Sequence, residues 1–228
     1  MRPKLALACA HRELIRMAET VQSMLVPLIG LFREWDTVTA DAIQEREDQV
    51  DRMQYETKLY VSRLSESGMS AEQARDAVEV VAMANSLEEA GDRIAVDLFG
   101  LARKMNSEAL SFSDEGLADI ERFHDQVVTN TQLALSVLTT GDAEAARQLV
   151  AEKDRIRAEE RLLQGRHLQR LHQRTAASVE TTNIHQETLR FLKQVNAAIS
   201  YVAYPIASQS GDLLDSRLAK PELAEGMP

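Results

Sequence analysis

The chain is poor in cysteine, aromatic residues, proline and glycine. Its single cysteine, Cys9, excludes an intramolecular disulfide and fits a reducing compartment. Aromatic residues make up 4% of the sequence, and there are 9 glycines and 5 prolines among 228 residues. Typical strand and turn formers are therefore scarce, whereas helix formers such as Ala, Leu, Glu, Arg and Gln are abundant. The composition predicts an all-α protein.

The chain also lacks an excess of positive charge and a long apolar run. Its formal net charge is −10 and its pI is about 5.1, whereas a nucleic-acid-binding domain is expected to be basic. The most apolar stretch, 24–32, is interrupted by Pro27 and is shorter than the ~18–20 residues that cross a bilayer. No secretory signal is visible at the N-terminus. We therefore expect a soluble, cytoplasmic protein that does not bind nucleic acid.

Capping residues and apolar spacing divide the chain into six long helices. Ser70 and Gln73 form a capping box before the third helix, and Asp142 is expected to cap the fifth. Pro27 and Pro205 fall inside the first and sixth helices and should kink them. Apolar residues of the third helix recur every three or four positions, at Val80, Ala84, Leu87, Gly91, Ile94, Leu98 and Leu101. The predicted helices cover approximately 2–34, 37–67, 70–101, 113–141, 142–172 and 178–210.

The two halves of the chain resemble each other weakly. Residues 36–50 align without a gap with residues 142–156, and the third helix of each half aligns with a similar offset, which pairs Leu87 with Leu192. Short connections favour antiparallel neighbours within each half. We therefore predict an all-α fold of two tandem antiparallel three-helix bundles, a duplicated six-helix fold. The repeats are expected over 1–106 and 107–211, with a disordered tail over 212–228.

Carboxylates repeat at helical spacing on two helices that should be neighbours. Glu47 and Asp51 lie four residues apart in the second helix, and Glu88 and Asp92 do the same in the third. Bringing four carboxylates together costs repulsion and desolvation unless a cation lies among them. Asn85 lies one turn before Glu88. It is expected to be either a further oxygen ligand or a hydrogen-bond donor to the metal ligands. Because oxygen ligands suit hard cations, we predict a site for iron, manganese, magnesium or calcium.

The spacing alone is not specific to a metal site. The chain holds 36 acidic residues, and most acidic pairs four apart belong to solvated faces. The third helix differs because Asn85, Glu88 and Asp92 form a stripe on which apolar residues flank the polar ones. Gly91 beside it costs roughly 1 kcal/mol of helix propensity relative to Ala, which is understandable if a helix or ligand approaches closely. Comparable pairs occur elsewhere, at Asp41/Glu45, Glu72/Asp76, Glu115/Asp119 and Glu121/Asp125.

These motifs resemble those of the PhoU domain. Leu-Glu-x-x-Gly-Asp at 87–92 and Glu-x-x-x-Asp at 47–51 are similar to motifs through which PhoU domains, duplicated three-helix bundles, bind metal. Four further stretches resemble the cytoplasmic C-terminal region of bacterial sodium/phosphate cotransporters, at 11–25, 45–65, 141–155 and 200–206. The glutamine- and serine-rich repeats of the transporter itself are absent. The resemblance implies a regulatory module of phosphate uptake, tethered through a parent transporter to the inner face of the cell membrane.

The resemblance also implies partners and leaves alternatives open. The expected partners are a membrane-embedded sodium/phosphate transporter domain or a phosphate-signalling protein, and a second copy in a homodimer. A stand-alone PhoU-type phosphate regulator and a metal-free helical scaffold are alternatives. A di-iron oxidase would need Glu-x-x-His pairs on two helices, and the inward-facing stretches lack them. We predict no catalytic residues.

The second half replaces the acidic motif with basic residues, so we expect no metal site there, or a weak one. The basic side chains are either an anion- or partner-binding patch or ordinary surface residues paired with nearby glutamates such as Glu152, Glu159 and Glu160. The aligned pairs are Glu47 with Lys153, Asp51 with Arg157, Asn85 with Arg190, Glu88 with Lys193, and Asp92 with Ala197.

The histidines show no spacing that would place two metal ligands on one helix face. His167 and His172, for example, are five residues apart rather than four. We interpret the histidines as surface residues; they are His11, His124, His167, His172 and His185.

Overall fold

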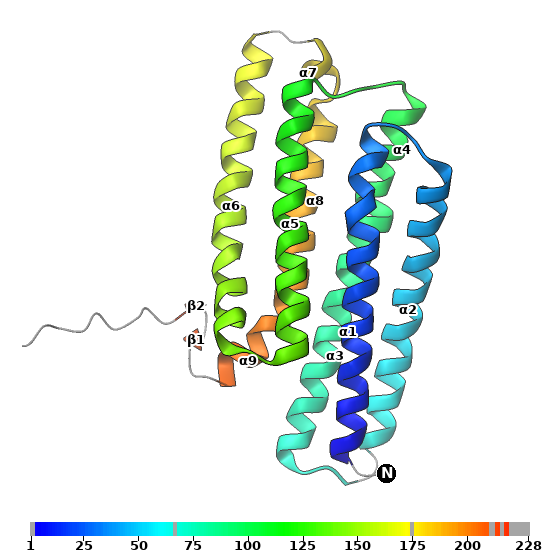
Figure 1. The fold of residues 1–228 in the computed structure, drawn as a ribbon, viewed down its shortest axis with the longest axis vertical. Helices are drawn as coiled ribbons and strands as arrows, with labels where there is room; N and C mark the ends of the chain where they lie inside the picture. Colours follow the sequence, from blue (N-terminus) through cyan, green and yellow to red (C-terminus); the bar gives the residue numbers. More distant parts are fainter. Residues whose placement is uncertain (1–2, 66–67, 174–175, 210–212, 215–216, 219–228) are drawn as a thin grey trace, which may run out of the picture.

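The first half of the computed structural model is a three-helix bundle (Figure 1). The structure describes residues 3–65, 68–173, 176–209, 213–214 and 217–218. The elements of the first half are α1 (Pro3–Leu28), the 3₁₀ turn η1 (Ile29–Phe32), α2 (Thr37–Ser65), α3 (Ala71–Asp92), the π-helical segment η2 (Arg93–Leu98) and α4 (Phe99–Ser107). Segments α3, η2 and α4 follow one another without a break and correspond to the predicted third helix.

The second half is a similar bundle that lies beside the first (Figure 1). Its elements are α5 (Asp114–Thr140), α6 (Ala143–His172), α7 (Ala176–Glu180), α8 (Thr182–Ile199), the 3₁₀ turn η3 (Ser200–Val202) and α9 (Ala203–Gln209). A two-residue antiparallel pairing joins β1 (Leu213–Leu214) to β2 (Arg217–Leu218), with Leu213 opposite Leu218. The fold is all-α, as predicted. Most of the predicted tail, 212–228, lies outside the described residues.

The predicted caps are present. Ser70 accepts a hydrogen bond from the Gln73 backbone at 3.2 Å, and the Gln73 side chain accepts one from the Ser70 backbone at 3.0 Å. The Asp142 side chain accepts a hydrogen bond from the backbone N–H of Ala145 at 2.7 Å. The residue before it, Gly141, has a positive φ of 66°. Side chains therefore satisfy N–H groups at the start of α3 and α6 that have no partner within the helix. These local signals fix where both helices begin.

Helix α1 is the central element of the molecule. It packs against α2 and α3 of its own bundle and against α5 of the other. The helix from Lys4 to Phe32 is long and apolar enough to cross a membrane by length and composition, which the prediction from the 24–32 stretch missed. The core helix of a soluble protein passes the same test. The structure buries one side of α1 completely, including Leu14, Met17 and Met24.

Pro27 changes the hydrogen bonding at the end of α1. Proline has no N–H, so the Ser23 carbonyl loses its usual partner one turn earlier. Arg46 of α2 donates to this carbonyl at 3.4 Å, and Nε2 of the buried His124 donates to the Leu25 carbonyl at 2.8 Å. The predicted kink stays a prediction. After Pro27, α1 gives way to a 3₁₀ turn, and side chains of α2 and α5 bind carbonyls of its last turns.

The π-helical segment η2 shifts the register of the third helix. The predicted apolar seam is buried as far as Leu98. Beyond it the predicted Leu101 is only partly buried, whereas Ala102 is fully buried. A π turn contains one residue more than an α turn, which accounts for this slip of one position. The Gln44 side chain of α2 donates to the Ala95 carbonyl within η2 at 2.8 Å.

Candidate metal centre

Three of the four predicted carboxylates converge between α2 and α3. Single oxygens from Glu47, Asp51 and Asp92 all lie within 4.8 Å of one another. Glu47 is half-buried, whereas Asp51 and Asp92 are exposed. Among the described residues this is the only group of three or more Asp, Glu, His and Cys side chains close enough to share a metal ion. Glu88 is not part of this triad.

The electrostatics of the site are unfavourable without a cation. Burial raises the pKa of Glu47 to about 7, and the charges of Asp51 and Asp92 add to this rise. Burial also raises the pKa of Glu88 and of Asp92, and Asp51 contributes to both shifts. Neighbouring carboxylates thus oppose one another's ionisation. Hard metal ions prefer such oxygen ligands, so the side chains present fit a metal of this class.

Gly91 lies where α3 packs against Val50 of α2, beside Glu88 and Asp92. A Cβ atom at Gly91 would lie 3.5 Å from Cγ1 of Val50 and 4.0 Å from Cε of Met24. Val50 sits between Glu47 and Asp51 in the sequence, so the two helices do approach each other beside the triad. The contact distance is an ordinary van der Waals distance, and an alanine would therefore fit. Steric exclusion alone does not require glycine at this position.

Asn85 already has a partner. Its Oδ1 atom accepts a hydrogen bond from Nε2 of Gln54 at 3.0 Å. The predicted role of Asn85 as a metal ligand would require this oxygen to give up or share that bond. Its role as a ligand stays a prediction, and the geometry favours Glu47, Asp51 and Asp92 as the primary ligands.

The corresponding face of the second bundle is basic, and its side chains are paired. Lys193 binds both oxygens of the buried Glu160, at 2.9 and 2.6 Å. The Lys153 ammonium donates to the Tyr204 hydroxyl at 2.7 Å. The remaining two predicted patch residues pair with exposed acids, Arg157 with Asp154 at 3.3 Å and Arg190 with Glu187 at 3.2 Å. These contacts favour paired surface residues, and the anion or partner patch stays a prediction.

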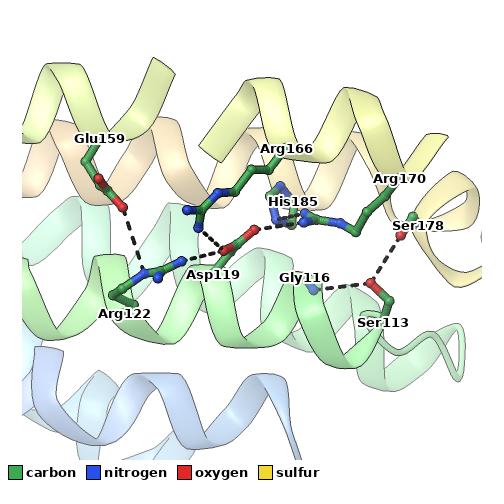
Figure 2. Close-up of polar contacts among 9 residues, drawn as sticks. All are labelled: Ser113, Gly116, Asp119, Arg122, Glu159, Arg166, Arg170, Ser178 and His185. Atoms are coloured by element: carbon green, nitrogen blue, oxygen red, sulfur yellow. Dashed lines mark hydrogen bonds and ion pairs between the residues drawn. The ribbon is translucent and has the colours of Figure 1, made fainter. Parts of the chain in front are cut away.

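A buried polar network in the second bundle escaped the sequence predictions (Figure 2). Asp119 of α5 accepts hydrogen bonds from Arg122 at 2.6 Å, Arg166 at 3.2 Å and Arg170 at 2.8 Å. Asp119 and Arg170 are both at least 95% buried. The interpretation of the Glu115/Asp119 pair as a solvated face is therefore wrong for Asp119. The three guanidinium groups offset much of the desolvation cost of burying the Asp119 carboxylate.

Two histidines extend this network into the core. An N–H of Arg170 donates to Nε2 of His185 at 3.3 Å, and the His185 ring stacks on His167 with centroids 4.4 Å apart. The surface interpretation is wrong for both residues, since each is 1% exposed. It is also wrong for His124, which is 3% exposed. Burial, followed by the charges of His167 and Arg170, lowers the pKa of His185 to about 3.

The sequence did contain a signal for this network. The buried residues of α6 follow one another at intervals of three, four or seven, so polar side chains continue a seam that begins as apolar. A polar residue on such a seam is more plausibly a buried partner than a solvated one. The seam consists of Ala146, Leu149, Ile156, Glu160, Leu163, His167 and Arg170.

Comparisons with known proteins point to one family. The PhoU domain model matches residues 14–96. A protein of Salmonella typhimurium named "Putative inorganic phosphate export protein YjbB" is 33% identical over 207 residues, which are 91% of this chain and 38% of that protein. The Escherichia coli protein of the same name is 30% identical over 212 residues, again 91% and 38%. The chain thus spans about two fifths of the length of these relatives.

Two solved structures share the fold. PhoU from Pseudomonas aeruginosa superimposes with a TM-score of 0.82 at 16% identity, over 91% of this chain and 98% of that one. The phosphate transport system regulatory protein PhoU from Streptococcus pneumoniae gives a TM-score of 0.79 at 13% identity, over 94% and 100%. At these identities the similarity establishes the arrangement of the helices.

Proposed function

We propose that this chain, whose residues 14–96 match the PhoU domain model, is a non-catalytic regulatory module of phosphate transport that binds a metal ion in its first bundle. The observation that carries the proposal is the convergence of Glu47, Asp51 and Asp92 on neighbouring helices. Relatives named as phosphate export proteins support phosphate as the transported substrate. Their greater length supports a module that acts on a membrane-embedded transporter, either as the cytoplasmic C-terminal domain of a sodium/phosphate cotransporter or as a separate regulator.

The geometry suggests what the metal would do. Glu47 and Asp51 lie in the middle of α2, whereas Asp92 is the last residue of α3 before η2. A hard cation would neutralise the repulsion among these carboxylates when bound. The side chains themselves would tie α2 to the point where the third helix changes register. Metal occupancy would therefore set the relative position of α2 and α3.

Metal analysis of the purified chain tests the site. Iron, manganese, magnesium and calcium are each added, and the bound metal and the unfolding temperature are measured. We expect one metal per chain and a higher unfolding temperature, both lost in Glu47→Gln/Asp92→Asn. The matched control is Asp41→Asn/Glu45→Gln, which removes an exposed acidic pair from α2 and should leave binding unchanged. Metal-free protein with unaltered stability would favour a plain helical scaffold.

A second measurement tests regulation. The Glu47→Gln/Asp92→Asn change is placed in the chromosomal gene, and uptake and efflux of labelled phosphate are followed in cells. We expect the response of the flux to external phosphate to be altered, whereas the Asp41→Asn/Glu45→Gln strain should behave like the parent. An unchanged response in both strains, with protein levels equal, would contradict a regulatory role for the metal site.

A further inference from the structure

A cleft of about 910 Å³ opens between the two bundles. It lies where the starts of α1 and α3 meet the α5–α6 turn and α9, toward the end of the molecule that carries the N-terminus in Figure 1. Its volume falls in the ~300–1,000 Å³ range of ligand-binding clefts. Neither the metal site nor the buried network of the second bundle contributes to its lining.

The floor of the cleft is apolar and comes from both bundles. Leu7 of α1 and Met83 of α3 line it on one side. Leu138 of α5 lines it on the other, together with Pro205 and Ile206 of α9. Pro205 and Ile206 are only partly buried, so part of this apolar surface stays open to solvent. An open apolar surface between two helical bundles suits the apolar face of another helix.

The rim of the cleft is acidic on one side. Glu72, Asp76 and Glu79 of α3 are spaced by four and three residues and so form a stripe along one face of the helix. In the described part of the chain, none of the three is bound by a basic side chain within ion-pair distance. Arg75 and His11 also line the cleft. Burial, followed by the charge of Asp76, raises the pKa of Glu79, whereas the charge of Arg75 lowers it. The lining thus sets three carboxylates against one arginine, Arg75, and a cationic partner would compensate the remaining negative charge.

We propose that this cleft docks a basic amphipathic helix from the transport partner. Apolar side chains of that helix would cover the floor, and Lys or Arg residues at four- and three-residue spacing would face Glu72, Asp76 and Glu79. Cytoplasmic segments next to membrane helices are rich in Lys and Arg, which makes them suitable sources of such a helix. The identity of the partner rests on the proposed function. The chemistry of the cleft does not.

The test uses the full chain and a defined probe. The probe is a fluorescein-labelled 18-residue helical peptide, roughly five turns long, with a leucine face and lysines spaced to match the acidic stripe. A second peptide carries glutamate in place of each lysine. Fluorescence anisotropy at physiological ionic strength should show binding of the lysine peptide and none of the glutamate peptide.

Matched variants locate the binding. Glu72→Gln/Asp76→Asn/Glu79→Gln should weaken binding of the lysine peptide at least tenfold. The control variant neutralises three carboxylates on another groove of the same bundle, between α1 and α2, and changes the net charge equally. It should alter binding less than twofold. Its substitutions are Glu13→Gln, Glu19→Gln and Glu56→Gln. Circular dichroism confirms that each variant is folded.

Four outcomes would overturn the proposal. Equal losses in both triple variants would show general attraction to an acidic protein, and no binding by either peptide would leave the cleft without its proposed occupant. Binding that appears only when the chain is ended at Gln209 would assign the cleft to the chain's own C-terminal segment. A dimer that dissociates in the cleft variant would assign it to a second copy. None of these results depends on metal or phosphate flux, so a failure here is distinguishable from a failure of the proposed function.

Discussion

Acidification should destabilise the second bundle through His185. This residue is 1% exposed and faces His167 and Arg170 of α6 and Asp119 of α5. Its protonation would place an imidazolium against the Arg170 guanidinium and a second imidazole in the core. The folded chain therefore excludes a proton that the unfolded chain accepts readily. Replacing His185 with glutamine keeps an acceptor for Arg170 and removes the titration.

The magnitude follows from the two pKa values of His185. The pKa is 6.5 in an exposed histidine and about 3 in the folded chain. A lowered pKa contributes stability that is fully present above pH 6.5 and is lost as the pH falls toward 3. At pH 5, 1.5 units below the unfolded value, the loss is about 2 kcal/mol. This figure hardly changes if the folded pKa is a unit higher, because only the unfolded chain is protonated at pH 5.

Urea unfolding at pH 7.5 and pH 5.0, followed by circular dichroism, measures the effect. Wild type should lose about 2 kcal/mol more between the two pH values than His185→Gln does. The control is His172→Gln, an exposed histidine near the end of α6, which should retain the pH dependence of wild type. If His185→Gln and wild type lose the same stability on acidification, the imidazole is not the proton-excluding group and the reasoning fails.

Three further predictions concern the two charged sites. Asp119→Asn should leave Arg170 buried without its carboxylate partner and lower the free energy of unfolding by about 3–5 kcal/mol. The exposed control Asp125→Asn should change the free energy of unfolding by less than ~0.5 kcal/mol. Similar urea midpoints for the two variants would contradict this prediction. Glu47→Gln should raise the free energy of unfolding of the metal-free chain at pH 7.5 by about 1 kcal/mol. This is less than the full pKa difference of Glu47 would give, because its side chain is partly solvated. The gain should vanish below pH 4.5, where the Glu47 carboxyl is protonated in both the folded and the unfolded chain. Manganese should raise the unfolding temperature more at pH 7.5 than at pH 5.0, since protons compete for a carboxylate with a pKa of about 7; an equal rise at both pH values in differential scanning calorimetry would place the metal elsewhere.

Features of the fold with local causes could be predicted from the sequence. The capping box at Ser70, the Asp142 cap and the apolar seam of the third helix each depend on residues within a few turns of one another, and all three are present. The break of the predicted sixth helix into α8, η3 and α9 also has a local cause. Pro205 removes the N–H that would reach the Tyr201 carbonyl, and η3 lies at that turn.

Features that depend on tertiary contacts could not be predicted in the same way. The convergence of Glu47, Asp51 and Asp92 required α2 and α3 to be correctly placed as neighbours, and the exclusion of Glu88 from the triad depends on side-chain geometry that spacing does not give. The burial of Asp119 was missed because charge was equated with exposure. Three arginines from two helices make its burial acceptable, and only the packing of α5 on α6 brings them together.

The π-helical segment η2 gives the third helix two independent halves. Before Arg93, one face of the helix lies against the carboxylates of α2. After Leu98, the buried positions of the helix are shifted by one residue along the sequence. Deleting a single residue between them would restore a continuous α-helix and rotate everything downstream by roughly 100°. Trp35 would then lose its edge-to-face contact with Phe99, now 5.4 Å between ring centroids. The extra residue thus lets one helix turn its carboxylates toward α2 at one end and Phe99 toward Trp35 at the other.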